Sequence, residues 1–196
     1  MNILKDFILT HDAVTIKTLN PSYKTTLTQI ATDSHIWQHA AFEPAFFEQQ
    51  WFDRAMNQMS EGQRWPFIVE YKGKLAGSTS FYDMDAKHNH VTIGYTWYTP
   101  EYWGTDLNPT VKFLLLSYAF EKLHCVRVEF TVDQRNTRSQ KALAKMGGQQ
   151  EGVLRKHLIL PDGSYRNTVV FSIIDSEWPT VKSHLLTRMV SAQTPN

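Results

Sequence analysis

The sequence has very little cysteine and almost no excess charge of either sign. Cys125 is its one cysteine among 196 residues, so no internal disulfide can form, as is typical of proteins from a reducing compartment. Lysine and arginine number 20 against 19 aspartates and glutamates, for a formal net charge of +1. Because nucleic acids and anionic membranes attract basic surfaces, this balance argues against either as the main partner.

Long apolar runs and targeting signals are also missing. The stretch FLLLSYAF (113–120) is far shorter than the roughly 20 apolar residues of a membrane-spanning helix. The opening MNILKDFILTHD lacks the apolar core and the cleavage site of a signal peptide. No repeat, low-complexity segment or linker interrupts the sequence. We therefore expect a soluble, cytoplasmic protein, with residues 1–190 as one domain and 191–196 as a loose tail.

The sequence does contain a clear succession of strand and helix patterns, and it is 42% hydrophobic, enough for a sizeable core. Apolar runs and alternation predict strands at 13–19, 66–71, 74–83, 90–98 and 125–132, and in EGVLRKHLIL and SYRNTVVFSII. Helical spacing predicts helices at 21–31, 44–60, 108–123 and 137–146, and a last helix capped by Ser176. Tight turns are predicted at Lys72-Gly73 and Pro161-Asp162-Gly163. This order predicts one mixed α/β domain.

Two predicted helix starts carry polar residues that suit a ligand. Asn108 and Pro109 are expected to cap and begin the 108–123 helix, whose free N–H groups and positive dipole end would suit a pyrophosphate. The same pair is a good helix start without any ligand. Asn136 is expected to cap the 137–146 helix, with Ser139 on its inward face. Both side chains either face a ligand or serve as local caps.

Four segments carry a resemblance to a known family: TIGYTWYTPEYWGTDLNPTVKFLLLSYAF, VDQRNTRSQKALAKMGGQQEGVLR, PDGSYRNTVVFSI and DSEWPTVK. Together they resemble the GCN5-related N-acetyltransferase (GNAT) superfamily across essentially the whole chain, nearest to the ribosomal-protein alanine N-acetyltransferases. The resemblance implies an α/β (α+β) fold whose mixed, mostly antiparallel sheet has about seven strands. That sheet would be splayed between strands 4 and 5 and flanked by helices.

The resemblance further implies an enzyme that moves the acetyl group of acetyl-CoA to a primary amine. The amine, a protein or peptide N-terminus or a small molecule, would attack directly in a ternary complex, with no metal. The helix that begins near Trp178 would cover the core or form a homodimer surface.

The family's coenzyme contacts carry over to particular residues of this chain. Asn136 would hydrogen-bond the pantetheine arm, and Ser139 would protonate the departing thiolate. The strand backbone expected to pair with pantetheine lies at Trp97, Tyr98 and Thr99. The phosphate-binding backbone is expected at Gly104, Thr105, Asp106, Leu107 and Asn108. Arg138, with Arg135 and Lys145, would neutralise phosphates or simply be solvated surface charge.

The phosphate loop departs from the family pattern Gln/Arg-x-x-Gly-x-Gly/Ala. Trp103 replaces the first polar residue, Asp106 the central glycine and Asn108 the last small residue. Because a carboxylate repels a pyrophosphate, either Asp106 points away or the loop binds coenzyme A weakly. Pro109 also removes one N–H donor.

The usual base positions of the family hold no strong base, because Thr92 and Leu158 occupy them. The remaining candidates are His157, Tyr95, Asp83, Asp85 and His90. An α-amine, with a pKa of about 7.7–8.0 against about 10.4 for lysine, needs the least help to lose its proton, so an α-amine acceptor is favoured.

Two other functions fit the same departures from the family. The missing base would suit a non-catalytic acyl-CoA sensor. Asp106 would suit a degenerate interaction domain that has lost its cofactor.

Overall fold

The computed structural model describes residues 7–39, 47–160 and 162–193. Within these ranges an eight-stranded sheet has the strand order β1-β2-β3-β4-β5-β6-β8-β7. The first five strands are β1 (Ile8–His11), β2 (Val14–Thr18), β3 (Arg64–Tyr71), β4 (Lys74–Asp85) and β5 (His90–Tyr98). The last three are β6 (Arg127–Asp133), β7 (Gln149–Ile159) and β8 (Tyr165–Ile174). The predicted mixed, mostly antiparallel sheet is confirmed.

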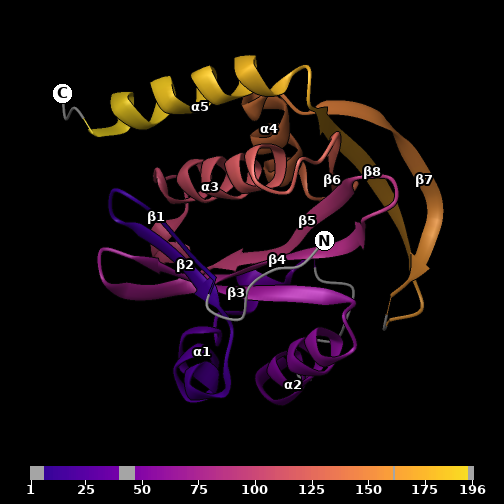
Figure 1. Ribbon diagram of the computed structural model, residues 1–196. Coiled ribbons are helices and arrows are strands. Elements are labelled where there is room, and N and C mark those ends of the chain that lie inside the picture. The colour runs from indigo at the N-terminus through magenta and orange to yellow at the C-terminus, as the bar shows by residue number, and fades with distance from the viewer. Residues whose placement is uncertain (1–6, 40–46, 161, 194–196) are drawn as a thin grey trace.

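Helices cover both faces of this sheet (Figure 1). One face carries α1 (Lys24–Ile30) and α2 (Phe47–Ser60). The other carries α3 (Leu107–Glu121), α4 (Thr137–Met146) and α5 (Trp178–Gln193). Each face has its own apolar cluster, the larger under α3 and the smaller, rich in tryptophan, under α1 and α2. No helix in the described ranges is long and apolar enough to span a membrane.

Strand β1 adds one strand to the seven expected from the sequence. It forms a hairpin with β2, and its residues alternate between exposed and half-buried. Ile8 is 59% exposed. A short edge strand with so little burial has only a weak apolar pattern, which is why the sequence did not predict it. The turn predicted at Lys72-Gly73 is confirmed, since both residues are left-handed (φ 51° and 75°).

Two helix starts differ from the expected ones. Helix α3 begins at Leu107 with Asp106 in the cap position, so Asn108 lies inside the first turn and is not the N-cap. Proline is tolerated throughout that turn, where N–H groups lack helical partners, so Asn-Pro does not fix the first residue. Before α5, Glu177 rather than Ser176 occupies the cap position, because its carbonyl accepts from the N–H of Val181.

Several boundaries fall at or beyond the edges of the described ranges. The residues 44–46 expected to begin the second helix, and Pro161 of the predicted turn, lie outside them. Helix α5 continues to Gln193, into the segment expected to be a loose tail, and residues 194–196 are not described. Of the two roles expected for this helix, the burial of Trp178, Val181, Leu185 and Met189 supports the one in which it covers the core.

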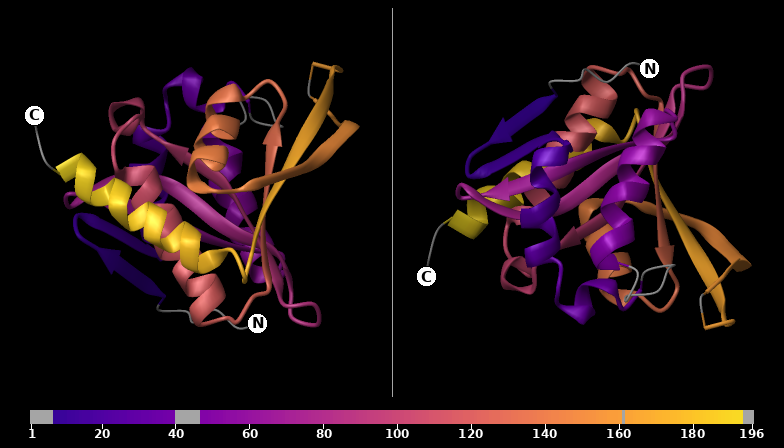
Figure 2. Two further views of the ribbon diagram at one scale, coloured as in Figure 1. Left: turned by 90° about the horizontal axis from the view of Figure 1, so that it is seen from above. Right: turned by 90° about the horizontal axis from the view of Figure 1, so that it is seen from below.

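The sheet opens between β5 and β6, the only parallel pair among the described strands. Their pairing covers His90–Thr92 on β5 and Arg127–Glu129 on β6, and stops there. From Ile93 and Phe130 onward the two strands diverge, as the view from above shows (Figure 2). The predicted splay between the fourth and fifth predicted strands, 90–98 and 125–132, is therefore confirmed.

Candidate active site

A bulge on β5 lies just beyond the point where this strand leaves β6. Tyr95 and Thr96 together face one β4 residue, Thr79, and Tyr95 has a left-handed φ of 51°. The two side chains lie on opposite faces of the sheet. Thr96 contacts Lys112 of α3, whereas the Tyr95 ring lies 5.0 Å from that of Tyr82 on the other face.

The opening between β5 and β6 beyond their paired residues is called the split below. The loop before α3 offers backbone donors at the open end of the split. The N–H groups of Gly104, Asp106 and Asn108 make no hydrogen bond with any described residue. Gly104 has a left-handed φ of 80°, which glycine adopts without strain. Free N–H groups at a helix start with the positive end of its dipole form an anion site, so the predicted phosphate loop has suitable geometry.

The Asp106 carboxylate is engaged away from the helix start. Its Oδ1 accepts a hydrogen bond of 2.6 Å from the hydroxyl of Tyr71 at the end of β3. That bond is the main reason why the pKa of Tyr71 rises to about 12. Of the two alternatives that the sequence left open, the contact with Tyr71 favours a carboxylate that points away from a bound phosphate.

The start of α4 lies against this loop. The guanidinium of Arg138 stacks 3.8 Å above the ring of Trp103. Asn136 is the N-cap, as predicted, since its Oδ1 accepts from the N–H of Ser139 at 3.0 Å. This bond leaves the Asn136 amide N–H₂ and the Ser139 hydroxyl without partners among the described residues. Both groups are half-buried and available to a ligand.

The end of β5 is tied to the same loop. The backbone carbonyl of Tyr98 accepts a hydrogen bond of 3.0 Å from the indole N–H of Trp103. The phenol hydroxyl of Tyr98 donates to Oδ1 of Asn108 at 3.4 Å. The Thr99 N–H donates to Ala76 on the β4 side. One of the backbone acceptors expected to pair with pantetheine is therefore already occupied in this structure.

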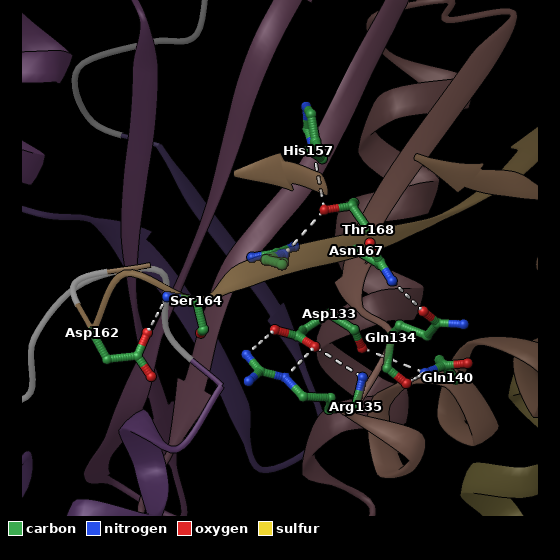
Figure 3. A network of polar contacts seen from close by, with 10 residues as sticks. Asp133, Gln134, Arg135, Gln140, His157, Asp162, Ser164, Asn167 and Thr168 are labelled. Atoms are coloured by element: carbon green, nitrogen blue, oxygen red, sulfur yellow. Dashed lines mark hydrogen bonds and ion pairs between the residues drawn. The ribbon is translucent and has the colours of Figure 1, made fainter. Parts of the chain in front are cut away.

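A polar network holds the turn between β6 and α4 (Figure 3). The buried Asp133 carboxylate accepts from the side chain and the backbone N–H of Arg135, and its carbonyl accepts from the N–H of Asn136. Burial alone would raise the pKa of Asp133, but the bonds from Arg135 outweigh it and lower the pKa. The Gln134 side chain accepts from Asn167 of β8. These bonds fix the place where α4 begins.

Lys112 is a residue that the sequence reasoning missed. It points from α3 into the split, is 7% exposed, and donates from Nζ to the Thr96 hydroxyl at 3.3 Å. Nζ also lies 5.5 Å from the ring centre of Phe130 on β6. No carboxylate of the described residues pairs with it, and burial lowers the pKa of its amine to about 7. A lysine within an otherwise apolar helix was the available signal.

Tyr82 reaches across the opposite face of the split. Its hydroxyl, from β4, bonds the Thr131 hydroxyl of β6 at 2.9 Å, passing over β5 at Gly94. A Cβ on Gly94 would lie 2.8 Å from the Tyr82 ring, so glycine makes this crossing possible. Burial raises the pKa of Tyr82 to about 12, which keeps its hydroxyl protonated near neutral pH.

The five candidate bases differ in their surroundings. Asp85 accepts backbone bonds from His88 and Lys87 that lower its pKa, and it lies 3.8 Å from His90. Asp83 has a raised pKa because of burial and the charge of Glu129.

The other two candidates contact residues of β8 and β3. His157 of β7 contacts the Thr168 hydroxyl at 3.0 Å (Figure 3), and Tyr95 covers Arg64 at 3.9 Å. Across the described ranges, no group of three His, Cys, Asp or Glu side chains is placed to hold a metal ion.

The sequence matches a known family over most of its length. Residues 14–149 match the model described as an acetyltransferase (GNAT) domain, so the chain belongs to the GNAT acetyltransferase family. The predicted membership is confirmed, and it makes the chain an acyltransferase. YoaA of Bacillus subtilis, named an uncharacterized N-acetyltransferase, is 33% identical over 61% of this chain and 67% of its own. YdaF of the same organism, a candidate ribosomal N-acetyltransferase, is 30% identical over 55% and 58%.

Solved structures share the fold over most of the chain. A candidate acetyltransferase of T. thermophilus has a TM-score of 0.85 and 31% identity, covering 96% of this chain and 100% of its own. RimJ of Mycobacterium smegmatis, solved with CoA-disulfide, has a TM-score of 0.75 and 20% identity over 89% and 88%. The spermidine N-acetyltransferase of Vibrio cholerae, solved with CoA and spermine, has a TM-score of 0.72 and 18% identity over 86% and 99%.

Proposed function

We propose that this protein acetylates an α-amine, with acetyl-CoA as the donor and direct attack in a ternary complex. One observation carries the proposal: β5 and β6 separate where the α3 loop presents free N–H groups and the first turn of α4 presents Asn136 and Ser139. Two solved relatives hold a form of coenzyme A. A thioester that entered this split would find donors for both its phosphates and its pantetheine arm.

The reaction forms one bond and breaks one. The acceptor nitrogen attacks the thioester carbon, the C–N bond forms, and the C–S bond breaks to leave the coenzyme A thiolate. Ser139 is proposed to give its proton to that sulfur, and the surplus proton of the amine returns through water to restore the Ser139 hydroxyl. Asn136 would hold the pantetheine amide through its free N–H₂ group. Lys112, the buried amine nearest the diverging strands, would add positive charge beside the thiolate.

An α-amine fits the weak set of bases. None of the five candidates is a buried residue, although the pKa of Asp83 is raised. At neutral pH roughly a tenth of α-amines are unprotonated, against less than about a thousandth of lysine amines. An acceptor that already carries a free lone pair needs only a water chain to remove its proton after attack.

The first experiment is a calorimetric titration of the purified protein with acetyl-CoA, followed by thiol release in the presence of amines. We expect micromolar binding, and faster release with peptide N-termini than with lysine side chains at neutral pH. Binding without acceptor-dependent release would show a sensor. Absence of binding up to millimolar acetyl-CoA would show a domain that has lost its cofactor. Equal turnover on lysine side chains would contradict the α-amine preference.

A further inference from the structure

Arg64, the first residue of β3, is a buried cation with no acidic partner among the described residues. It is 2% exposed and belongs to no ion pair within that part of the chain. Its Nε donates to the Ser80 hydroxyl at 2.8 Å and its Nη1 to Gln58 at 3.4 Å, but its Nη2 has no partner there. A buried charge left without a counter-charge is costly, so proteins rarely keep one without a use.

The surroundings of Arg64 are aromatic rather than acidic. Its guanidinium lies 3.9 Å from the ring centre of Tyr95 and 5.6 Å from that of Trp51 on α2. Ring faces offset part of the cost of burial, but they do not accept the in-plane N–H of Nη2. Burial lowers the pKa of Arg64 to about 10, which still leaves it charged at neutral pH.

A second unpartnered donor lies in the aromatic cluster around Arg64, which consists of Trp51, Tyr95 and Trp97. Trp97 of β5 is 6% exposed, and its indole N–H has no hydrogen-bond partner in the described ranges. Its ring is 5.6 Å from that of Trp51, which is also the neighbour of Arg64. Both unpaired groups are donors that cannot accept, so each requires an oxygen acceptor, and the guanidinium favours one that carries negative charge.

This cluster borders the split on the face of α1 and α2. Arg64 pairs in register with Tyr82, whose hydroxyl reaches β6, and it stacks on Tyr95 of the β5 bulge. The other face of the bulge meets Lys112, where we place the thioester. A molecule bound beside Arg64 would therefore approach the split from the side opposite to coenzyme A.

We propose that Arg64 anchors an anionic oxygen group, a carboxylate or a phosphate, carried by the acceptor amine. This inference rests on the proposed acetyl transfer and narrows its substrate class to amines that bear an acidic group. Two more arginines, Arg54 and Arg166, lie near enough to Arg64 or Tyr95 to contribute to the same field. A polyamine brings only positive charge and would be repelled from this face.

The test compares acceptors that differ only in the anionic group. A panel of free amino acids is assayed for thiol release, each beside its own amide, together with phosphoethanolamine beside ethanolamine, and spermidine. We expect kcat/KM to be about 10- to 100-fold higher for the anionic member of at least one pair, and spermidine to be inactive. The amides have less basic amines, so amine protonation alone would favour them instead.

Substitutions of Arg64 test whether its guanidinium causes the preference for anionic acceptors. Arg64→Met should raise KM for the anionic acceptors by about tenfold or more and leave their neutral partners unchanged. Arg64→Lys keeps the charge without the forked geometry and should restore part of the preference. Arg188→Met removes an arginine from α5, on the opposite face of the sheet, and is the matched control. It should change KM for neither the anionic acceptors nor their neutral partners. If Arg64→Met lowers turnover equally for both members of each pair, Arg64 is merely structural and the inference fails.

A binding measurement separates this inference from the proposed function. Trp51 and Trp97 flank the cluster, so the anionic amino acids should change tryptophan fluorescence in the absence of acetyl-CoA, and Arg64→Lys should weaken that response. If the wild-type protein acetylates no amine, yet shows this Arg64-dependent response, the anchor stands and the transferase proposal fails. If amines are acetylated without any preference for the anionic member and fluorescence does not respond, the anchor is wrong and the transferase proposal stands.

Discussion

Two buried cations, neither with an acidic partner among the described residues, lie on opposite faces of one bulge. On the α3 face, the Lys112 amine contacts Thr96, and on the α1 and α2 face the Arg64 guanidinium stacks on Tyr95. Thr96 and Tyr95 are consecutive residues of β5. The chain has therefore placed one such positive group on each side of the point where the sheet opens.

The two cations differ in whether they can shed their charge. Burial lowers the pKa of Lys112 to about 7, so its amine is neutral or charged according to what binds beside it. Burial lowers the pKa of Arg64 only to about 10, so its guanidinium remains charged at neutral pH. Lys112, whose amine can gain a proton, can stabilise a neutral thioester that becomes a negatively charged thiolate. Arg64, whose charge is permanent, can bind an anion that stays charged throughout the reaction.

The largest expected effect is on stability and comes from Lys112→Met. The unfolded chain keeps the lysine proton up to about pH 10.4, whereas the folded chain loses it near pH 7. Between these values the unfolded state binds more protons, so the lysine costs less stability as pH rises. Above pH 7 the free energy of unfolding of the wild type should rise relative to that of the variant by up to about 1.4 kcal/mol per pH unit. Below pH 7 the two free energies should change with pH in the same way.

Urea unfolding of both proteins between pH 6 and pH 9 measures this difference, in which the titration of all other groups cancels. Arg64→Met is the comparison, since removing a group that does not titrate in this range should leave no such slope. Equal pH dependence of wild type and Lys112→Met would show that the lysine stays protonated in the fold, and the contrast between the two cations would disappear.

Most of the fold could be predicted from the sequence because its signals are local. The 137–146 helix was predicted to the residue, since Asn136 caps it and Gly147 ends it with a left-handed φ of 105°. The hairpin turn at Lys72-Gly73 was also predicted at the correct residues, because the sequence of the turn is a local signal. The predictions that failed were the short edge strand Ile8–His11, the first residue of α3 and the Ser176 cap of α5, where burial is slight or several turn positions accept the same residues.

The sequence offered candidate residues only for the proposed coenzyme side of the site. Asn136, Ser139 and the 104–108 loop follow a spaced pattern along the chain, and the structure brings them to one end of the split. Arg64 lies just before a strand predicted to begin at residue 66, with no local pattern to mark it. Its unpaired guanidinium is produced by residues from α2, β4 and β5 together, which spacing along one segment cannot reveal.

A second prediction tests which group on the coenzyme side protonates the thiolate. Ser139→Ala should lower kcat by about 100-fold while the dissociation constant for acetyl-CoA stays nearly constant, because a general acid acts only in the transition state. Thr137→Ala, which removes an exposed hydroxyl from the same helical turn, is the control. If Ser139→Ala retains full kcat while Lys112→Met loses it, the adjustable amine rather than the hydroxyl supplies the proton.

The smallest expected effect concerns the carboxylate that replaces a family glycine. Asp106→Asn removes one negative charge from the phosphate loop but keeps an oxygen to accept from Tyr71, so acetyl-CoA should bind roughly threefold to tenfold more tightly. The pKa of Tyr71 should fall from about 12 toward about 10, as seen by ultraviolet titration against the wild type.

Together the two readouts of Asp106→Asn separate charge from shape. Tighter binding that fades at high salt, with a lowered tyrosine pKa, would show that the carboxylate acts on the phosphates only through its field. A lowered pKa with unchanged affinity would place Asp106 beyond the reach of the phosphates. Weaker binding would mean that the charged bond to Tyr71 holds the loop open for coenzyme A. In that case the coenzyme side depends on its own anion much as the acceptor side depends on its cation.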